Sequence, residues 1–195
     1  VDGPAPGENE AIPDGPDGTR VELPDENTFD ADASAPRVLL LGDSGALVLG
    51  EELVDYGAEL NMPVAVAADP ECTIVYPEGV VRHASGEVGG PGPCQEERWD
   101  AVSHAAEVFD PDVIVVYLAN TGMVEYQMDD EWVNDCSPAY LDYLEGTLAE
   151  EIDYFQGEHD ADVVLLTSNY IADLSESGND WVDCRNGLMH DLAER

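Results

Sequence analysis

A serine that follows a short apolar run is the strongest chemical feature of the chain. Residues 38–41 are Val-Leu-Leu-Leu, and Gly42, Asp43 and Ser44 come next, directly before a segment with helical spacing. A serine that begins a helix just beyond a buried strand exposes its hydroxyl near the positive end of the helix dipole. Free backbone N–H groups of the first turn can stabilise an oxyanion there. The pattern predicts a serine nucleophile, and a helix cap is the other explanation for the same residues.

The segments around this serine alternate between strand and helix patterns. Short apolar runs predict buried strands at residues 38–41, 64–68, 113–118 and 163–167. Apolar residues at three- and four-residue steps predict helices over residues 45–60, 96–109 and 140–155. This alternation predicts an α/β fold of the flavodoxin-like three-layer α/β/α type, with a parallel sheet between helices. Ligands bind such sheets at the carboxyl ends of the strands, where Ser44 is expected.

The folded domain is expected to begin at Arg37. Proline, glycine and acidic residues dominate residues 1–36, which show no helical or strand periodicity. Such a segment buries too little apolar surface to offset the entropy lost on ordering it. We therefore expect a flexible acidic linker over residues 1–36 and one domain over residues 37–195. Two long loops, 69–93 and 126–138, are expected to border the site.

The charge of the chain excludes some classes of partner. Asp and Glu number 44 against 6 basic residues, all arginine, and the formal net charge is -38. Nucleic acid would be repelled, because binding a phosphate backbone requires a cationic face. No EF-hand loop, clustered metal ligands or dinucleotide-binding glycine motif is visible, so neither a metal nor a cofactor is expected. A solvated acidic surface, as in a salt-adapted or secreted protein, is the favoured interpretation.

Four cysteines, Cys72, Cys94, Cys136 and Cys184, are spread along the chain without a Cys-x-x-Cys pair. Their number is compatible with two disulfides in any of three connectivities, and it favours an oxidising compartment over buried thiols in the cytosol. No apolar run approaches the roughly 20 residues that a membrane helix needs. We expect a soluble domain whose signal or membrane anchor lies outside this piece.

The run 38–41 followed by Gly42-Asp43-Ser44-Gly45 resembles the first block of the SGNH/GDSL hydrolase family. Further motifs occur in the order found in one subset, the SGNH domains attached to bacterial membrane acyltransferases that modify cell-surface glycans. These motifs are Cys94 to Trp99, Asp110-Pro111-Asp112-Val113, Trp132-Val133, Ser137-Pro138-Ala139-Tyr140 and Arg185-Asn186. The resemblance covers residues 37–195, and the order of the motifs is its stronger part.

This resemblance implies roles for individual residues. Ser44 would be the nucleophile, and Asn120, which follows the third strand, would form the oxyanion hole together with the Ser44 N–H. Gly42, Asp43 and Gly45 would support the oxyanion site. The fold would be the SGNH hydrolase fold, lacking its last strand in this piece.

The resemblance also bears on the second strand and on the cysteines. Glu71 stands where related sequences carry a glycine, which departs from the family pattern. Members of the subset place one cysteine after the second strand and another before the next helix. The resemblance therefore implies a Cys72–Cys94 pair and, with it, a Cys136–Cys184 pair.

The base of the family is a histidine in an Asp-x-x-His segment after a final strand. Not one of the four histidines has an aspartate three residues before it; they are His83, His104, His159 and His190. We expect a truncation, with the last strand and this segment beyond Arg195.

The function implied is that of a serine esterase or O-acyltransferase acting on acyl esters of cell-surface glycans through an acyl-Ser44 intermediate. The expected partners are an acylated polysaccharide or peptidoglycan substrate and an upstream membrane acyltransferase domain, and the expected location is extracytoplasmic. A catalytically inactive SGNH-like domain that binds glycan is the alternative, favoured by Glu71 and by the absent histidine. A generic flavodoxin-like binding domain is the third possibility, for which Asp43 makes a poor phosphate-binding loop.

Overall fold

The structure is a computed structural model that describes residues 20–24, 35–69, 72, 77, 79–83, 85–90, 95–119, 124–169 and 176–194. The described helices are α1 (Ser44–Glu59), α2 (Gln95–Phe109), α3 (Pro138–His159) and α4 (Glu176–Ala193). The strands of the main sheet are β1 (Arg20–Glu22), β3 (Val64–Ala68), β2 (Val38–Gly42), β6 (Val113–Tyr117) and β9 (Asp162–Leu166), in this spatial order. A smaller sheet holds β5 (Val88–Gly89), β4 (Val81–His83), β7 (Val124–Met128) and β8 (Glu131–Val133).

Four strands of the main sheet, β3, β2, β6 and β9, are parallel. Strands β2 and β3 are short runs of Val, Leu, Ala and Gly that are buried on both faces along nearly their whole length, as expected for a sheet covered by helices. In the register of the sheet, Gly42 pairs with Ala68 on one side and with Tyr117 on the other. The carboxyl ends of β3, β2 and β6 therefore lie level with one another, beside the start of α1.

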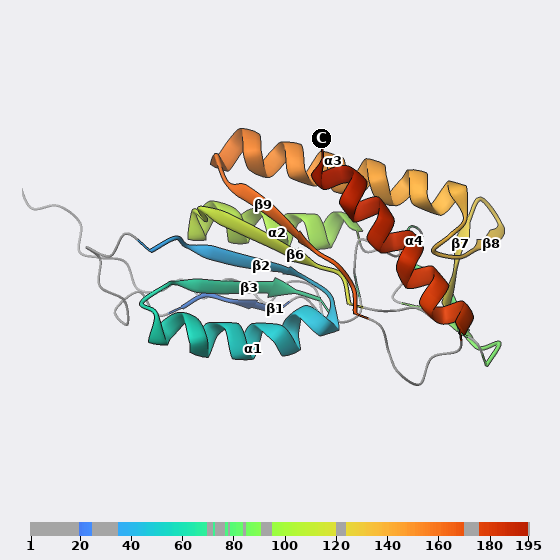
Figure 1. Cartoon of the computed structure of the whole chain (residues 1–195), viewed down its shortest axis with the longest axis horizontal. Helices are drawn as coiled ribbons and strands as arrows, with labels where there is room; N and C mark the ends of the chain where they lie inside the picture. The colour runs from blue at the N-terminus through green and yellow to red at the C-terminus, as the bar shows by residue number, and fades with distance from the viewer. Residues whose placement is uncertain are drawn as a thin grey trace, which may run out of the picture.

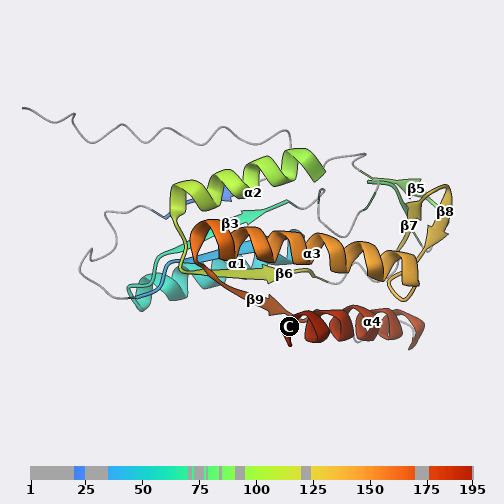
Figure 2. The ribbon, with the colours of Figure 1, turned by 90° about the horizontal axis from the view of Figure 1, so that it is seen from above.

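Helices cover the two faces of the sheet unequally (Figures 1 and 2). On one face, α2 and α3 pack over a large core, and the end of α4 joins it through Leu188, Met189 and Leu192. On the other face, α1 packs over a small core centred on Leu40 and Val66. This arrangement confirms the predicted α/β class with a mostly parallel sheet and is compatible with three α/β/α layers.

Two predictions about the connecting segments were wrong in part. The predicted linker 1–36 contains β1, which pairs with the edge of β3 in antiparallel orientation. A three-residue strand has no visible period, and β1 forms because β3 offers an unpaired edge. The predicted loops 69–93 and 126–138 contain the strands of the small sheet, which are two to five residues long.

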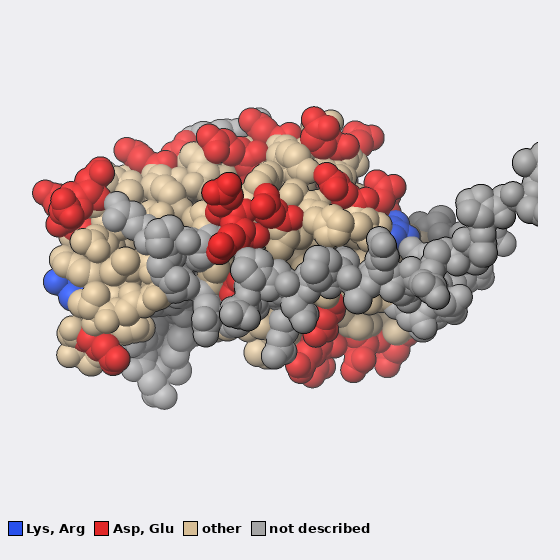
Figure 3. Space-filling view, turned by 180° about the vertical axis from the view of Figure 1, so that it is seen from behind, with Lys and Arg blue, Asp and Glu red and all other residues tan. Residues whose placement is uncertain are grey.

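The predicted pairing of Cys136 with Cys184 is confirmed, and this disulfide joins the segment before α3 to α4. Cys72 is disulfide-bonded as well, but Cys94 lies outside the described residues. Acidic side chains are spread over the face shown in Figure 3, with little positive charge among them. No helix in the described part of the chain is long and apolar enough to cross a membrane.

Candidate active site

Ser44 lies at the carboxyl edge of the sheet, as the sequence predicts. Strand β2 ends at Gly42, Asp43 caps the helix, and Ser44 is the first residue of α1. The Gly45 N–H donates to Asp43 Oδ1 at 2.8 Å, so Asp43 and not Ser44 supplies the helix cap. Ser44 is exposed to solvent, while Asp43 is buried. A buried cap thus holds an exposed hydroxyl at the positive end of α1.

Two glycines allow the turn at Ser44 to touch the end of β6. A Cβ atom on Gly42 would lie 2.0 Å from the carbonyl oxygen of Tyr117. A Cβ atom on Gly45 would lie 2.2 Å from the Cβ of Ala119. Both distances are far below a van der Waals contact, so only glycine fits at these positions. The contact brings Ser44 close to the residue that precedes Asn120 in the chain.

The carboxylate of Asp43 is an unusual feature of this turn. Burial raises the pKa of Asp43 above its ordinary value, although the N–H groups of Gly45, Ala119 and Ala46 and the charge of Arg185 act in the opposite direction. Its Oδ2 atom is buried and has no hydrogen-bond partner among the described residues. The folded protein therefore holds a carboxylate whose ionisation costs free energy.

An Asp43→Asn variant is expected to be more stable than the wild type at neutral pH. The folded protein binds more protons than the unfolded chain between pH 3.8 and the raised pKa of Asp43, so ionisation of Asp43 lowers stability as pH rises through this window. Asparagine keeps an oxygen that can cap α1, and it cannot ionise. The measurement is urea unfolding from pH 3 to pH 8. The gain should disappear at the acidic end.

The control for this variant is Asp142→Asn, which removes an exposed carboxylate on α3. Its stability difference from the wild type should be small across the same range. A stability difference for Asp43→Asn that stays constant with pH would contradict the argument.

Two neighbouring residues of α4 hold the ends of β6 and β9. Arg185 Nη1 donates to the Ala119 carbonyl at 3.0 Å, and Arg185 Nη2 donates to Asp135 Oδ2. Asn186 accepts from the Ser168 N–H at 2.8 Å and donates to the Ser168 carbonyl at 2.9 Å. In the sequence, the Arg185-Asn186 dipeptide was only one of the motifs that carry the family resemblance. Its contacts span 66 and 18 residues along the chain, so no local pattern could assign them.

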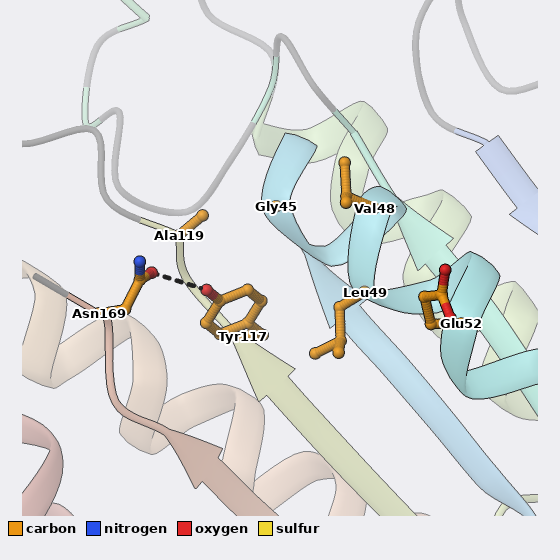
Figure 4. Close-up of a pocket in the computed structure, with 7 residues that line it drawn as sticks. All are labelled: Gly45, Val48, Leu49, Glu52, Tyr117, Ala119 and Asn169. Carbon is orange, nitrogen blue, oxygen red and sulfur yellow. Dashed lines mark hydrogen bonds between the residues drawn. The ribbon is translucent and has the colours of Figure 1, made fainter. Parts of the chain in front are cut away.

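A shallow, mostly apolar depression of about 500 Å³ adjoins the start of α1. Figure 4 shows its lining, with Tyr117 and Leu49 on opposite sides and Glu52 at one end. The Tyr117 hydroxyl donates to Asn169 Oδ1 at 3.0 Å. Burial and the charge of Asp43 raise the pKa of Tyr117, so the hydroxyl keeps its proton. Ser44 itself does not line the depression, which offers room for a small apolar group beside Gly45, the next residue in the chain.

The other predicted residues lie apart from this place or cannot be placed. Asn120 and Glu71 lie outside the described residues. The four histidines are on β4, on α2, at the end of α3 and on α4, and none of them lines the depression. No group of three or more His, Cys, Asp or Glu side chains within the described residues is arranged to hold a metal ion.

No family model matches the chain, and no curated protein matches it significantly.

Proposed function

We propose that this chain is an SGNH-type serine hydrolase or O-acyltransferase domain that acts on acyl esters of cell-surface glycans. One observation carries the proposal. Ser44 is an exposed serine at the first position of α1, at the carboxyl edge of a parallel sheet, with the end of β6 packed against the same turn. The Gly45 N–H donates to Asp43, so the Ser44 N–H is the donor of the first helical turn that we assign to the oxyanion.

The reaction would proceed through two acyl transfers. Ser44 Oγ attacks the ester carbonyl carbon while a base accepts its proton, and the alcohol leaves after taking up a proton. Water or a sugar hydroxyl then attacks the acyl-Ser44 ester and releases the serine. The Ser44 N–H and Asn120 would hold the oxyanion in both steps.

The proposed reaction needs a general base to accept the Ser44 proton, and none of the four histidines supplies it. In the family it belongs to an Asp-x-x-His segment after a last strand, which would lie beside β9. Strand β9 pairs with β6 alone among the described strands, and Val164 on it is 42% exposed. An open edge beside the site is where such a strand would add.

The resemblance and two properties of the structure support the proposed substrate class and location. The apolar depression beside Gly45 would receive a small acyl group. The Cys136–Cys184 disulfide fits an extracytoplasmic location, where disulfides persist. Neutral or acetylated sugars suit a surface of this charge better than an anionic polymer does.

The proposal is tested by reaction of the 195-residue chain with a fluorophosphonate, which phosphonylates activated serines, in a buffer that contains imidazole as the base that the four histidines do not supply. Peptide mass spectrometry should find the label on Ser44 and not on Ser85, an exposed serine in the turn between β4 and β5. Equal labelling of the two serines would show that Ser44 has no special reactivity. That result would favour the alternative, an inactive domain that binds glycan.

A further inference from the structure

Arg185 is the largest of the fully buried side chains among the described residues. Its side chain is 1% exposed, and so is that of its ion-pair partner Asp135. Burial alone would lower the pKa of Arg185, but Tyr126, Asp135 and Tyr140 raise it above its ordinary value. The guanidinium is therefore a fixed positive charge inside the fold.

The second contact of this guanidinium leads to the candidate site. Arg185 Nη1 donates to the Ala119 carbonyl, which belongs to the peptide group that leads into Asn120. Ala119 packs against Gly45, and its N–H faces the carboxylate of Asp43. Ala119 thus connects Arg185 to Asp43 and Gly45, the two residues that flank Ser44 in the chain.

The Cys136–Cys184 disulfide holds both members of the Arg185–Asp135 ion pair in place. Asp135 precedes Cys136 and Arg185 follows Cys184, and the two cysteines are joined. The disulfide therefore brings Asp135 and Arg185 together from segments 50 residues apart. Next to Arg185, the side chain of Asn186 forms hydrogen bonds with both the N–H and the carbonyl of Ser168. The Ser168 hydroxyl in turn donates to the Leu118 carbonyl. The end of β6 is thus tied to α4 at two consecutive residues, Leu118 and Ala119.

We propose that Arg185 is a positioning residue, which holds the Ala119 peptide against the turn 42–45 and so fixes the geometry in which Ser44 and the oxyanion donors react. The proposal rests on the proposed function for its effect on reactivity. Well-packed apolar residues often replace buried ion pairs without loss of stability, so stability alone does not account for this pair. A charged group that also binds a carbonyl at the site has a positional role.

The test replaces the pair by apolar residues of similar size, Arg185→Met with Asp135→Leu, in the 195-residue chain. We expect the maximal rate of Ser44 phosphonylation to fall about 10- to 100-fold, because small displacements at a reacting group cost rate in this range. The fluorophosphonate concentration at half-maximal rate should change less than about threefold. Amide hydrogen exchange in peptides covering residues 42–46 and 116–119 should become faster.

The chain offers a matched control in its second buried ion pair. Arg98 and Glu151 join α2 to α3 with side chains that are 7% and 6% exposed. The variant Arg98→Met with Glu151→Leu should leave hydrogen exchange at residues 42–46 and 116–119 unchanged. Arg185→Lys serves as a milder variant, because an ammonium can pair with Asp135 but lacks the planar fork that also reaches Ala119. It should show the same two effects to a smaller extent.

Each outcome separates this proposal from the proposed function. Unchanged exchange at residues 42–46 and 116–119 in the Arg185 variants, or equal change in the Arg98 control, would overturn the positioning role. Faster exchange in a protein whose wild-type Ser44 is not labelled would keep the positioning role and reject the serine hydrolase.

Discussion

Replacing Ser44 by alanine is expected to remove fluorophosphonate labelling of the chain, with a fall of at least about 1,000-fold in the labelling rate. The hydroxyl is the nucleophile in the proposed reaction, so no other group can take its place. Ser44 is exposed, and Asp43 supplies the helix cap, so the free energy of unfolding should change by less than about 0.5 kcal/mol. The measurements are intact-protein mass spectrometry after labelling and urea unfolding of the same samples.

Addition of imidazole to the buffer gives a second test of Ser44 as the nucleophile. None of the four histidines lines the depression beside Ser44, so a small base from solution should accelerate the reaction of the wild type. The Ser44→Ala variant should show no acceleration at any imidazole concentration. Ser85→Ala is the matched control and should react like the wild type. Labelling that survives in Ser44→Ala would refute the assignment of the nucleophile.

Removing the Cys136–Cys184 disulfide is expected to lower the free energy of unfolding by about 4 kcal/mol. The bond closes a loop with a sequence separation of 48 residues, and the entropy of closing such a loop in the unfolded chain gives this magnitude. The variant is Cys136→Ala with Cys184→Ala, measured by urea unfolding without reductant. Its m-value should rise, because the unfolded chain is no longer held compact by this bond.

Treatment of the wild type with reductant is a less specific version of this test, because Cys72 is also disulfide-bonded. Reduction of the wild type should therefore lower the free energy of unfolding more than the double substitution Cys136→Ala with Cys184→Ala does. A loss below about 1 kcal/mol in the double variant would show that contacts between α3 and α4 are sufficient to hold the two segments together.

The main strands and the place of Ser44 could be predicted because their signals are local. Strand β2 is a run of apolar residues that ends in a glycine, and the cap and the serine follow in the next two positions. Each of these features needs only a few neighbouring residues. Three of the four described helices, α1, α2 and α3, were predicted within a few residues of their ends for the same reason, since their apolar faces repeat over several turns.

The small sheet was missed although one signal for it was present. Asp129 and Asp130 have φ angles of 48° and 65° and form the two-residue turn between β7 and β8. This turn geometry is commonly built from Asn or Asp with glycine, and two consecutive aspartates are an unusual version of it. Its flanking strands are too short to show a clear alternation.

The network around Arg185 could not be predicted from sequence at all. Its contacts to Ala119 and Asp135 depend on how α4 packs beside β9 and on the position of the disulfide. A single arginine in a helix gives no periodic signal, and most arginines lie at the surface. The resemblance marks Arg185 as part of a motif, but only the folded arrangement shows which groups it contacts.

Among the described strands β9 pairs with β6 alone, and its other side bears on how copies of this protein meet in solution. A strand with free backbone groups and an exposed valine can pair with the same strand of a second molecule. Each molecule carries a formal charge of -38, and the mutual repulsion extends over a Debye length of about 8 Å at physiological salt. Electrostatic repulsion therefore opposes self-association here more than the shape of the strand does. Concentrated salt or acid should remove this barrier, and light scattering across a salt series would detect the dimers that form.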